Sequence, residues 1–195
     1  MQDSQPSKAA AFYELTKPGI VVYVTITAGV GAFVGSRGSL ELWLAFHTMF
    51  GTGITTAGAL ALNQYTERDA DSMMMRTRGR PIPSGRLSPI SALYFSQALL
   101  LSGLAYLTLT VSWLPAAIAA FSAVIYQGVY TPLKSRSYGA TLAGGVPGAL
   151  PTLIGWSAAT GTLEPAGFAL FGITYLWQLP HVLALAWMLR EDYRL

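Results

Sequence analysis

The chain contains no cysteine, and only 11% of its 195 residues are charged. The lack of cysteine excludes disulfides, thiolate nucleophiles and cysteine-ligated metal sites, and it leaves the redox environment undetermined. The lack of charge is more informative, because roughly 25% of the residues in an average soluble domain are charged. A chain with so little charge and 52% hydrophobic residues is not expected to have water as its main solvent.

Long stretches of the chain contain no Asp, Glu, Lys or Arg. They are residues 18–36, 42–66, 87–133, 137–163 and 165–189. About 20 such residues cross a bilayer core as a helix, so four stretches fit one span each, and the third, broken by a turn signal at Ser112–Pro115, fits two. A soluble helical protein seldom buries helices this long without a charge, and lipid excludes open β-structure. The sequence predicts one all-α domain over residues 1–195, a polytopic membrane helical bundle with six transmembrane helices.

The N-terminal segment, residues 1–17, does not resemble a cleavable targeting sequence. The apolar stretch after it is too long for a signal-peptide core, and the segment is neither rich in arginine nor free of acids, as an import sequence would be. We therefore expect it to remain part of the mature chain.

Basic residues gather on one side of the expected membrane. If six helices alternate in direction, residues 1–17, the loops 67–87 and 134–137 and the C-terminal end share a side that carries 11 of the 12 Lys and Arg residues. The positive-inside rule places this side in the cytoplasm. The charges are divided among short loops rather than forming one stripe, so we expect no nucleic-acid partner.

The second expected helix ends in a run of acids. Asn63, Glu67 and Asp71 are four residues apart, so a continued helix stacks them on one face, about 6 Å apart per step, whereas Asp69 points elsewhere. One amide and two carboxylates are hard oxygen ligands, which Mg²⁺ accepts while it keeps several waters and bridges to substrate phosphates. The alternative is a solvated loop in which acids and arginines merely pair.

Several cations on the same side are candidates for binding phosphate oxygens. Arg76 and Arg80 follow the acids, and arginine binds phosphate in bidentate fashion. Lys134 and Arg136 follow the fourth helix. Lys134 either reaches a phosphate or simply anchors that helix at the charged surface.

The sixth expected helix ends in a second acidic cluster. Gln178, His181 and Asp192 share one face, Glu191 lies about 80° off it, and a bend is expected at Pro180. By the alternation of helices, Asp192 reaches the same surface as the first acidic cluster. Two acidic helix ends can then face each other across a shared cavity, as a metal and diphosphate site requires.

Three further features have both a structural and a functional interpretation. His181 lies about 16 Å below Asp192, where an ionisable group is expected to face the bundle interior, and it either packs there or contacts a polar or metal-bearing substrate. His47, near the opposite face, is interpreted as structural. The pairs Gly31/Gly35 and Gly144/Gly148 indicate close helix packing, or alternatively a substrate-entry surface.

The stretch from Asn63 to Pro81 resembles the first aspartate-rich motif of the UbiA-type intramembrane prenyltransferases, in its haem O synthase form. The Arg-Thr-x-x-Arg-Pro segment at 76–81 and the Trp-Gln-x-Pro-His segment at 177–181 are specific. Residues 15–19, 130–136, 144–151 and 155–156 are also similar to segments of that family, in the same order.

The resemblance implies transfer of farnesyl from farnesyl diphosphate to a vinyl group of haem B, giving haem O, with Mg²⁺ as cofactor. It also implies a multi-pass protein of the bacterial inner membrane, with haem A synthase or terminal oxidase assembly machinery as further partners. Such enzymes have about nine transmembrane helices, so we expect the chain to stop before its natural C-terminus. The catalytic and metal-binding residues implied are Asn63, Glu67, Asp71, Glu191 and Asp192. The substrate-binding residues implied are Arg76, Arg80, Lys134, Arg136, Gln178 and His181.

Other functions remain open at this point. A UbiA-type enzyme that prenylates a quinone or chlorophyll precursor is the nearest alternative. A transporter or channel would also place ionisable groups in the membrane, but near the midplane rather than at one surface. A non-catalytic assembly factor would leave the phasing of the acids and arginines unexplained.

Overall fold

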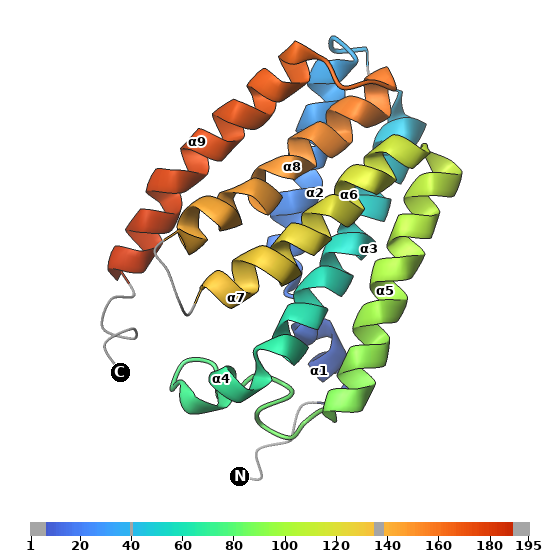
Figure 1. The fold of residues 1–195 in the computed structure, drawn as a ribbon. Coiled ribbons are helices and arrows are strands. Elements are labelled where there is room, and N and C mark those ends of the chain that lie inside the picture. The colour runs from blue at the N-terminus through green and yellow to red at the C-terminus, as the bar shows by residue number, and fades with distance from the viewer. Residues whose placement is uncertain (1–6, 40, 135–138, 189–195) are drawn as a thin grey trace.

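Six long helical rods run side by side in the computed structural model, which describes residues 7–39, 41–134 and 139–188 (Figure 1). These ranges contain no strand, so the all-α prediction is confirmed. Each rod lies within one of the charge-free stretches. The rods are α2 (Pro18–Gly35), α3 (Leu42–Thr66), α5 (Pro89–Thr110), the continuous α6 (Trp113–Ile125), η1 (Tyr126–Tyr130) and α7 (Thr131–Leu133), then α8 (Ala140–Thr160) and α9 (Pro165–Met188).

The rods are long enough for a bilayer. In the described ranges, three segments combine sufficient length with sufficient hydropathy to cross a membrane: Pro18–Gly35, Pro89–Thr110 and Trp113–Leu133. The other rods, α3, α8 and α9, have 25, 21 and 24 residues, and about 20 residues span a hydrocarbon core. The chain is a multi-pass membrane protein, and the count of six crossings stays a prediction.

Local signals in the sequence set several helix ends. Ser88 caps α5 by accepting a hydrogen bond from the Ser91 amide at 3.1 Å, and Pro89 follows as the first helical residue. Gly161 ends α8 in the left-handed conformation, with φ 73°, which glycine adopts without a steric penalty. The expected break between α5 and α6 is present, but it lies at residues 111–112 rather than 112–115, because α6 already begins at Trp113.

Glycines bring α2 and α8 into backbone contact. A Cβ on Gly31 would overlap the Thr152 carbonyl, and a Cβ on Gly155 would overlap the Ala28 carbonyl oxygen. This agrees with a packing role for Gly31 and with small residues at interfaces between membrane helices. The second predicted pair differs, because the side chains of Tyr130 and Gln178 occupy the space beside Gly144 and Gly148 respectively.

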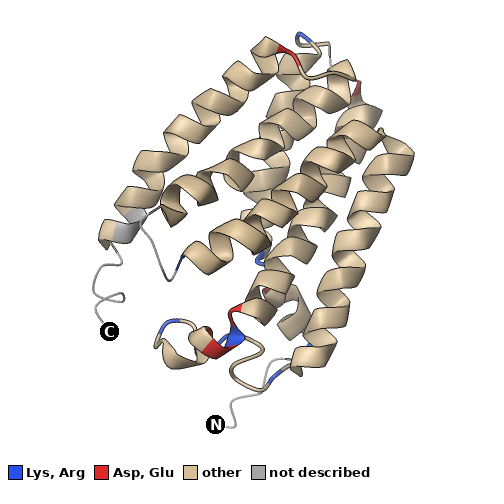
Figure 2. Cartoon of the chain, viewed as in Figure 1, with Lys and Arg blue, Asp and Glu red and all other residues tan. Residues whose placement is uncertain are grey.

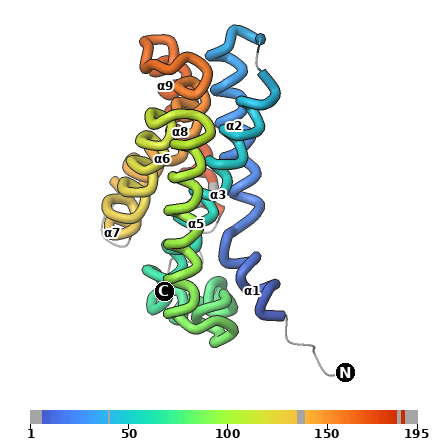
Figure 3. Tube along the Cα trace, turned by 90° about the vertical axis from the view of Figure 1, so that its right-hand side faces the viewer, coloured from blue at the N-terminus to red at the C-terminus, as the bar shows by residue number. Residues whose placement is uncertain are grey.

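Two apolar clusters fill the bundle at different heights. One joins α1 (Lys8–Leu15) to α3, α5 and the loop before α5, and consists of Ala11, Leu15, Ala61, Ile82, Leu87 and Ala92. The other joins α5, α6 and α8, and consists of Leu107, Ala116, Ile118, Ala119, Leu150, Leu153 and Ile154. Figure 3 shows α1 at the foot of α2, on the far side of the bundle from α7.

Charged residues occupy the two ends of the rods and leave the sides apolar. Most of them gather at the end that carries α4 (Arg68–Met73) and the N-terminus, as Figure 2 shows. His47 lies on α3 toward the other end, where its Nδ1 is 2.5 Å from the Tyr106 hydroxyl and its ring meets Trp43 edge-on. These contacts support the structural interpretation of His47.

Candidate active site

The helical phase of Asn63, Glu67 and Asp71 survives a break in the helix. α3 ends at Thr66 and α4 begins at Arg68, but the Glu67 amide still donates to the Asn63 carbonyl at 2.9 Å. The Asp71 amide likewise donates to the Glu67 carbonyl at 2.8 Å. The i, i+4 spacing therefore carries through the junction, as the sequence predicts.

Asn63 is buried and held from two directions. Its side-chain Nδ2 donates to Thr131 Oγ1 at 3.0 Å, and the Tyr126 hydroxyl donates to its Oδ1 at 3.4 Å. Tyr126 and Thr131 both face it because η1 is a π-helical segment. Thr131, the residue after η1, also donates from Oγ1 to the Tyr126 carbonyl. Pro132 has no N–H to donate to the Gly128 carbonyl, which favours this local widening.

Glu67 pairs with a lysine that is distant in sequence. Lys134 Nζ, just past α7, lies 3.2 and 3.3 Å from its two carboxylate oxygens. The Glu67 side chain is 12% exposed and that of Lys134 39% exposed. This contact brings the ends of α3 and α7 together, so Lys134 does more than mark the end of its own helix.

Asp71 is the most deeply buried acid among the described residues. It is 4% exposed, and its Oδ2 accepts a hydrogen bond from Arg80 at 2.6 Å. Thr77 Oγ1 donates to the Asp71 backbone carbonyl at 3.0 Å and fixes the loop between them. Asp69 differs as expected, since its side chain is 85% exposed and pairs with the neighbouring Arg68, at 3.5 Å.

Lys17 joins this cluster, although it was not predicted as a site residue. It lies between α1 and α2, and it interacts electrostatically with Arg80, Glu67, Lys134 and Asp71. Burial, followed by the repulsion of Arg80, lowers the pKa of Lys17 to about 8. A signal was available: Lys17 is a basic residue directly before a charge-free stretch, on the same predicted side as the acids.

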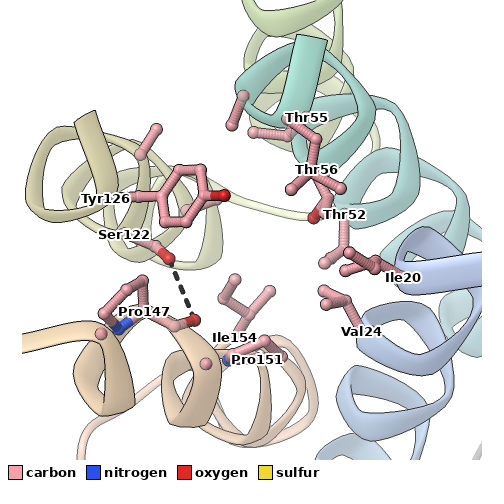
Figure 4. Close-up of a pocket in the computed structure, with 16 residues that line it drawn as sticks. Ile20, Val24, Thr52, Thr55, Thr56, Ser122, Tyr126, Pro147, Pro151 and Ile154 are labelled. Atoms are coloured by element: carbon pink, nitrogen blue, oxygen red, sulfur yellow. Dashed lines mark hydrogen bonds between the residues drawn. The ribbon is translucent and has the colours of Figure 1, made fainter. Parts of the chain in front are cut away.

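An apolar cavity of about 250 Å³ lies among α2, α3, α6 and α8 (Figure 4), and Tyr126, which donates to Asn63, is one of its lining residues. Ala59 and Leu60, about one helical turn from Asn63, form part of its wall, and Thr52 and Ile154 lie deeper. Ser122 Oγ donates to the Pro147 carbonyl at 3.3 Å across the wall, which is possible because Pro151 has no N–H for that carbonyl. The remaining lining residues are Ile20, Val24, Thr55, Thr56, Ala119, Ala123, Tyr126, Gly144, Gly148 and Pro151.

The predicted residues of the last helix divide into two groups. Gln178 packs against Gly148, a residue of the cavity wall. His181 was expected to face the bundle interior, but it is exposed and stacks on Trp177, with ring centroids 5.1 Å apart. The reason is that α9 packs chiefly against α8 within the described ranges, which leaves its opposite face open.

Other predicted residues lie in turns or outside the described ranges. Arg76 lies in the turn that follows α4. Arg136, Glu191 and Asp192 lie outside the described residues. The proposed meeting of Asp71 with Asp192 therefore stays a prediction.

The donors around Asn63 suit a hard divalent cation that is shared with a substrate. In the described ranges no three Asp, Glu or His side chains gather closely enough to hold a metal by themselves. One amide and two carboxylates remain, in helical phase, and the amide is hydrogen-bonded to Tyr126 of the cavity wall. Such a set fits a cation such as Mg²⁺, which is bound through one or two carboxylates and completed by waters and substrate phosphates.

Comparison with known proteins identifies the family. A model of the UbiA prenyltransferase family matches residues 22–195. The chain belongs to this family. The resemblance seen in the sequence is thus confirmed.

Relatives named protoheme IX farnesyltransferase are similar over most of the chain. The proteins from Solibacter usitatus and Myxococcus xanthus are both 43% identical to it, over 93% and 98% of the chain. The protein from Aquifex aeolicus is 41% identical over 92% of the chain. The chain spans 65%, 65% and 62% of the length of these three relatives.

A solved structure shares the fold. The structure described as giving insights into the biosynthesis of digeranylgeranylglyceryl phosphate synthase in membranes matches 96% of this chain and 66% of its own, with a TM-score of 0.80. The sequence identity is 19%, so this likeness concerns the fold alone.

Proposed function

We propose that this chain is part of an intramembrane prenyltransferase that transfers the farnesyl group of farnesyl diphosphate to a vinyl group of haem B, giving haem O. The observation that carries the proposal is the position of a buried cluster of acids and cations beside an apolar cavity. A diphosphate head and a prenyl tail need those two environments next to each other. The names of the relatives favour haem B as the acceptor over a quinone or chlorophyll precursor.

Binding of the diphosphate is assigned to the cations of the cluster. Asp71 holds Arg80 and Glu67 holds Lys134, so both cations are already positioned before the substrate arrives. Mg²⁺ held by Asn63, Glu67 and Asp71 would neutralise the negative charge that develops on the leaving diphosphate. Arg76, Arg136, Glu191 and Asp192 are proposed to complete this site, and Gln178 and His181 to contact the haem.

The cavity is assigned the chemistry of the prenyl group. The C1–O bond of farnesyl diphosphate breaks, C1 bonds to the haem vinyl group, and water adds to the resulting cation with loss of a proton. Apolar residues of the cavity wall, such as Val24, Ala59 and Ile154, exclude bulk water from the short-lived allylic cation. Tyr126 and Thr131 keep Asn63 in place throughout.

The cavity also favours an enzyme over a transporter. Two of its lining residues, Ala119 and Ile154, also belong to the apolar cluster that joins α5, α6 and α8. A transport pathway would need polar groups through that cluster. We further propose that the enzyme lies in the inner membrane of a bacterial cell. The cluster of acids and cations would face the cytoplasm, because most basic residues lie at the same end of the bundle.

The test uses the full-length protein in membranes supplied with haem B, farnesyl diphosphate and Mg²⁺. We expect haem O to form, to require the metal, and to be detected by its mass and its shifted absorption. Asp71→Asn should lower turnover by about 100-fold or more, since it removes the buried charge at the centre of the site. Asp69→Asn is the matched control, because it makes the same change on an exposed acid two residues away. Equal loss in both variants, or none in Asp71→Asn, would refute the assignment.

A further inference from the structure

The corner between α1 and α2 is fastened to the candidate active site from two sides. Gln64, next to Asn63 on α3, donates from Nε2 to the Leu15 carbonyl at 2.9 Å. On the other side, Arg86 donates to both carboxylate oxygens of Glu14, at 2.6 and 2.9 Å. Arg86 belongs to the same loop as Arg80, so Lys17 is held between α3 and that loop.

Lys17 itself has an unusual backbone for a residue with a Cβ. Its φ of 51° and ψ of 62° place it in the left-handed region, directly before Pro18 opens α2. This conformation is unfavourable for any residue except glycine, and such residues concentrate where the surrounding structure needs one side-chain direction. The corner anchors described above are what hold it there.

The acids near Lys17 are already paired with other cations. Glu67 is paired with Lys134, and Asp71 is paired with Arg80. Across the described part of the chain, no acid lies within 4 Å of the Lys17 ammonium. Three cations therefore surround two carboxylates, in a partly buried position where an unmatched positive charge is unfavourable unless an anion joins it.

We propose that Lys17 binds the diphosphate of the prenyl substrate, as a third cation beside Arg80 and Lys134. The inference rests on the proposed function and adds a residue to it from a part of the chain far from the acidic motif. The lowered pKa of Lys17 agrees with this, because burial and the repulsion of Arg80 and Lys134 outweigh the attraction of Glu67 and Asp71. A lysine whose role was only to anchor α2 at the membrane surface would gain nothing from being held among other cations.

The experiment measures binding of inorganic pyrophosphate, with Mg²⁺, to the full-length protein in detergent by titration calorimetry. Lys17→Met removes the charge but keeps the length of the side chain. We expect it to weaken pyrophosphate binding by about 10-fold to 100-fold, the range for loss of one charge-assisted contact. Lys17→Arg should retain most of the affinity. Lys8→Ala, on the exposed start of α1, should bind as the unmodified protein does.

Two further readouts separate a binding role from a structural one. The KM for farnesyl diphosphate should rise with the loss of pyrophosphate affinity, whereas the affinity for haem B, followed by its Soret absorption, should stay the same. If Lys17→Met unfolds at the usual temperature and binds pyrophosphate within about twofold of the unmodified protein, the proposal is overturned. The proposal is also overturned if Lys17→Met loses affinity for haem B as much as for pyrophosphate, because that would indicate general disruption of the structure.

The same data distinguish this inference from the proposed function. Loss of pyrophosphate binding in Lys17→Met, together with no prenylation of haem B by the unmodified protein, would remove haem B as acceptor and leave the role of Lys17 intact. If Lys17→Met forms haem O with an unchanged KM for farnesyl diphosphate, the role of Lys17 is refuted and haem B remains the acceptor. Failure of the unmodified protein to bind pyrophosphate at all would refute both.

Discussion

Arg80 donates to the buried carboxylate of Asp71 at 2.6 Å, across a loop that leaves the end of α4 and returns to it. The pair places an arginine and an expected metal ligand in direct contact. A diphosphate with its metal would have to share or replace this contact, so the same two groups would serve as a structural pair in the free protein and as separate ligands in the complex.

The Asp71–Arg80 pair predicts a clear stability effect. Arg80→Ala leaves a buried carboxylate without its partner, which costs about 1–3 kcal/mol or more. Thermal unfolding in detergent should therefore occur at a lower temperature. Arg78→Ala is the control, because this exposed arginine lies two residues away in the same loop and its loss should change stability by at most about 0.5 kcal/mol. Equal stability of the two variants would contradict a supporting role for the pair.

The glycines between α2 and α8 provide a second prediction. Gly155→Ala puts a methyl group onto the Ala28 carbonyl, where neither backbone can yield without separating the helices. We expect loss of several kcal/mol or failure to accumulate in membranes. Gly172→Ala on α9 is the matched control, since nothing lies within 4 Å of the added methyl, and it should be neutral or slightly stabilising. The measurement is the yield and unfolding temperature of the two purified variants.

The helices and the first half of the site were predictable from the sequence because their signals are local. Charge-free runs fixed the rods nearly to their ends, and the four-residue spacing of Asn63, Glu67 and Asp71 persisted although the helix breaks at Glu67. Hydrogen bonds between neighbouring turns carry such phase through a short junction.

What escaped prediction depends on contacts between distant parts of the chain. Lys17 reaches the site because contacts distant in sequence hold the corner in place, among them the one between Gln64 and Leu15, 49 residues apart. The π-helical turn that aims Tyr126 at Asn63 has only Pro132 as a local signal. The face of α9 occupied by His181 depends on which helices pack against it, and periodicity alone does not say which neighbours a helix has.

The charge state of Lys17 gives a pH prediction. Its pKa of about 8 lies below the usual value of 10.5 because of burial and of Arg80 and Lys134, which outweigh Glu67 and Asp71. The ammonium is therefore charged below pH 8 and loses its proton as the pH rises above it. Pyrophosphate affinity should fall between about pH 8 and pH 9.5 more steeply in the unmodified protein than in Lys17→Arg, whose side chain stays charged. Titration calorimetry on both proteins over that interval checks this, and parallel curves would show that the titration of Lys17 does not control the affinity.

The deep end of the cavity is expected to set the length of prenyl chain that the protein accepts. Ala119 and Ile154 line that end and also belong to the apolar cluster that closes the bundle beyond it. Ala119→Leu should fill this end, raise the KM for farnesyl diphosphate and shift the preference toward the shorter geranyl diphosphate. Ile154→Ala should instead open it and improve the use of geranylgeranyl diphosphate, at a stability cost of about 2–5 kcal/mol for the truncated side chain.

Ala117→Leu is the control for Ala119→Leu, because it makes the same change on the exposed side of α6 and should leave the preference unaltered. The readout is the ratio of kcat/KM among the three diphosphates, and because a ratio cancels any general loss of folded protein, an unchanged ratio in both cavity variants would show that the prenyl chain lies elsewhere.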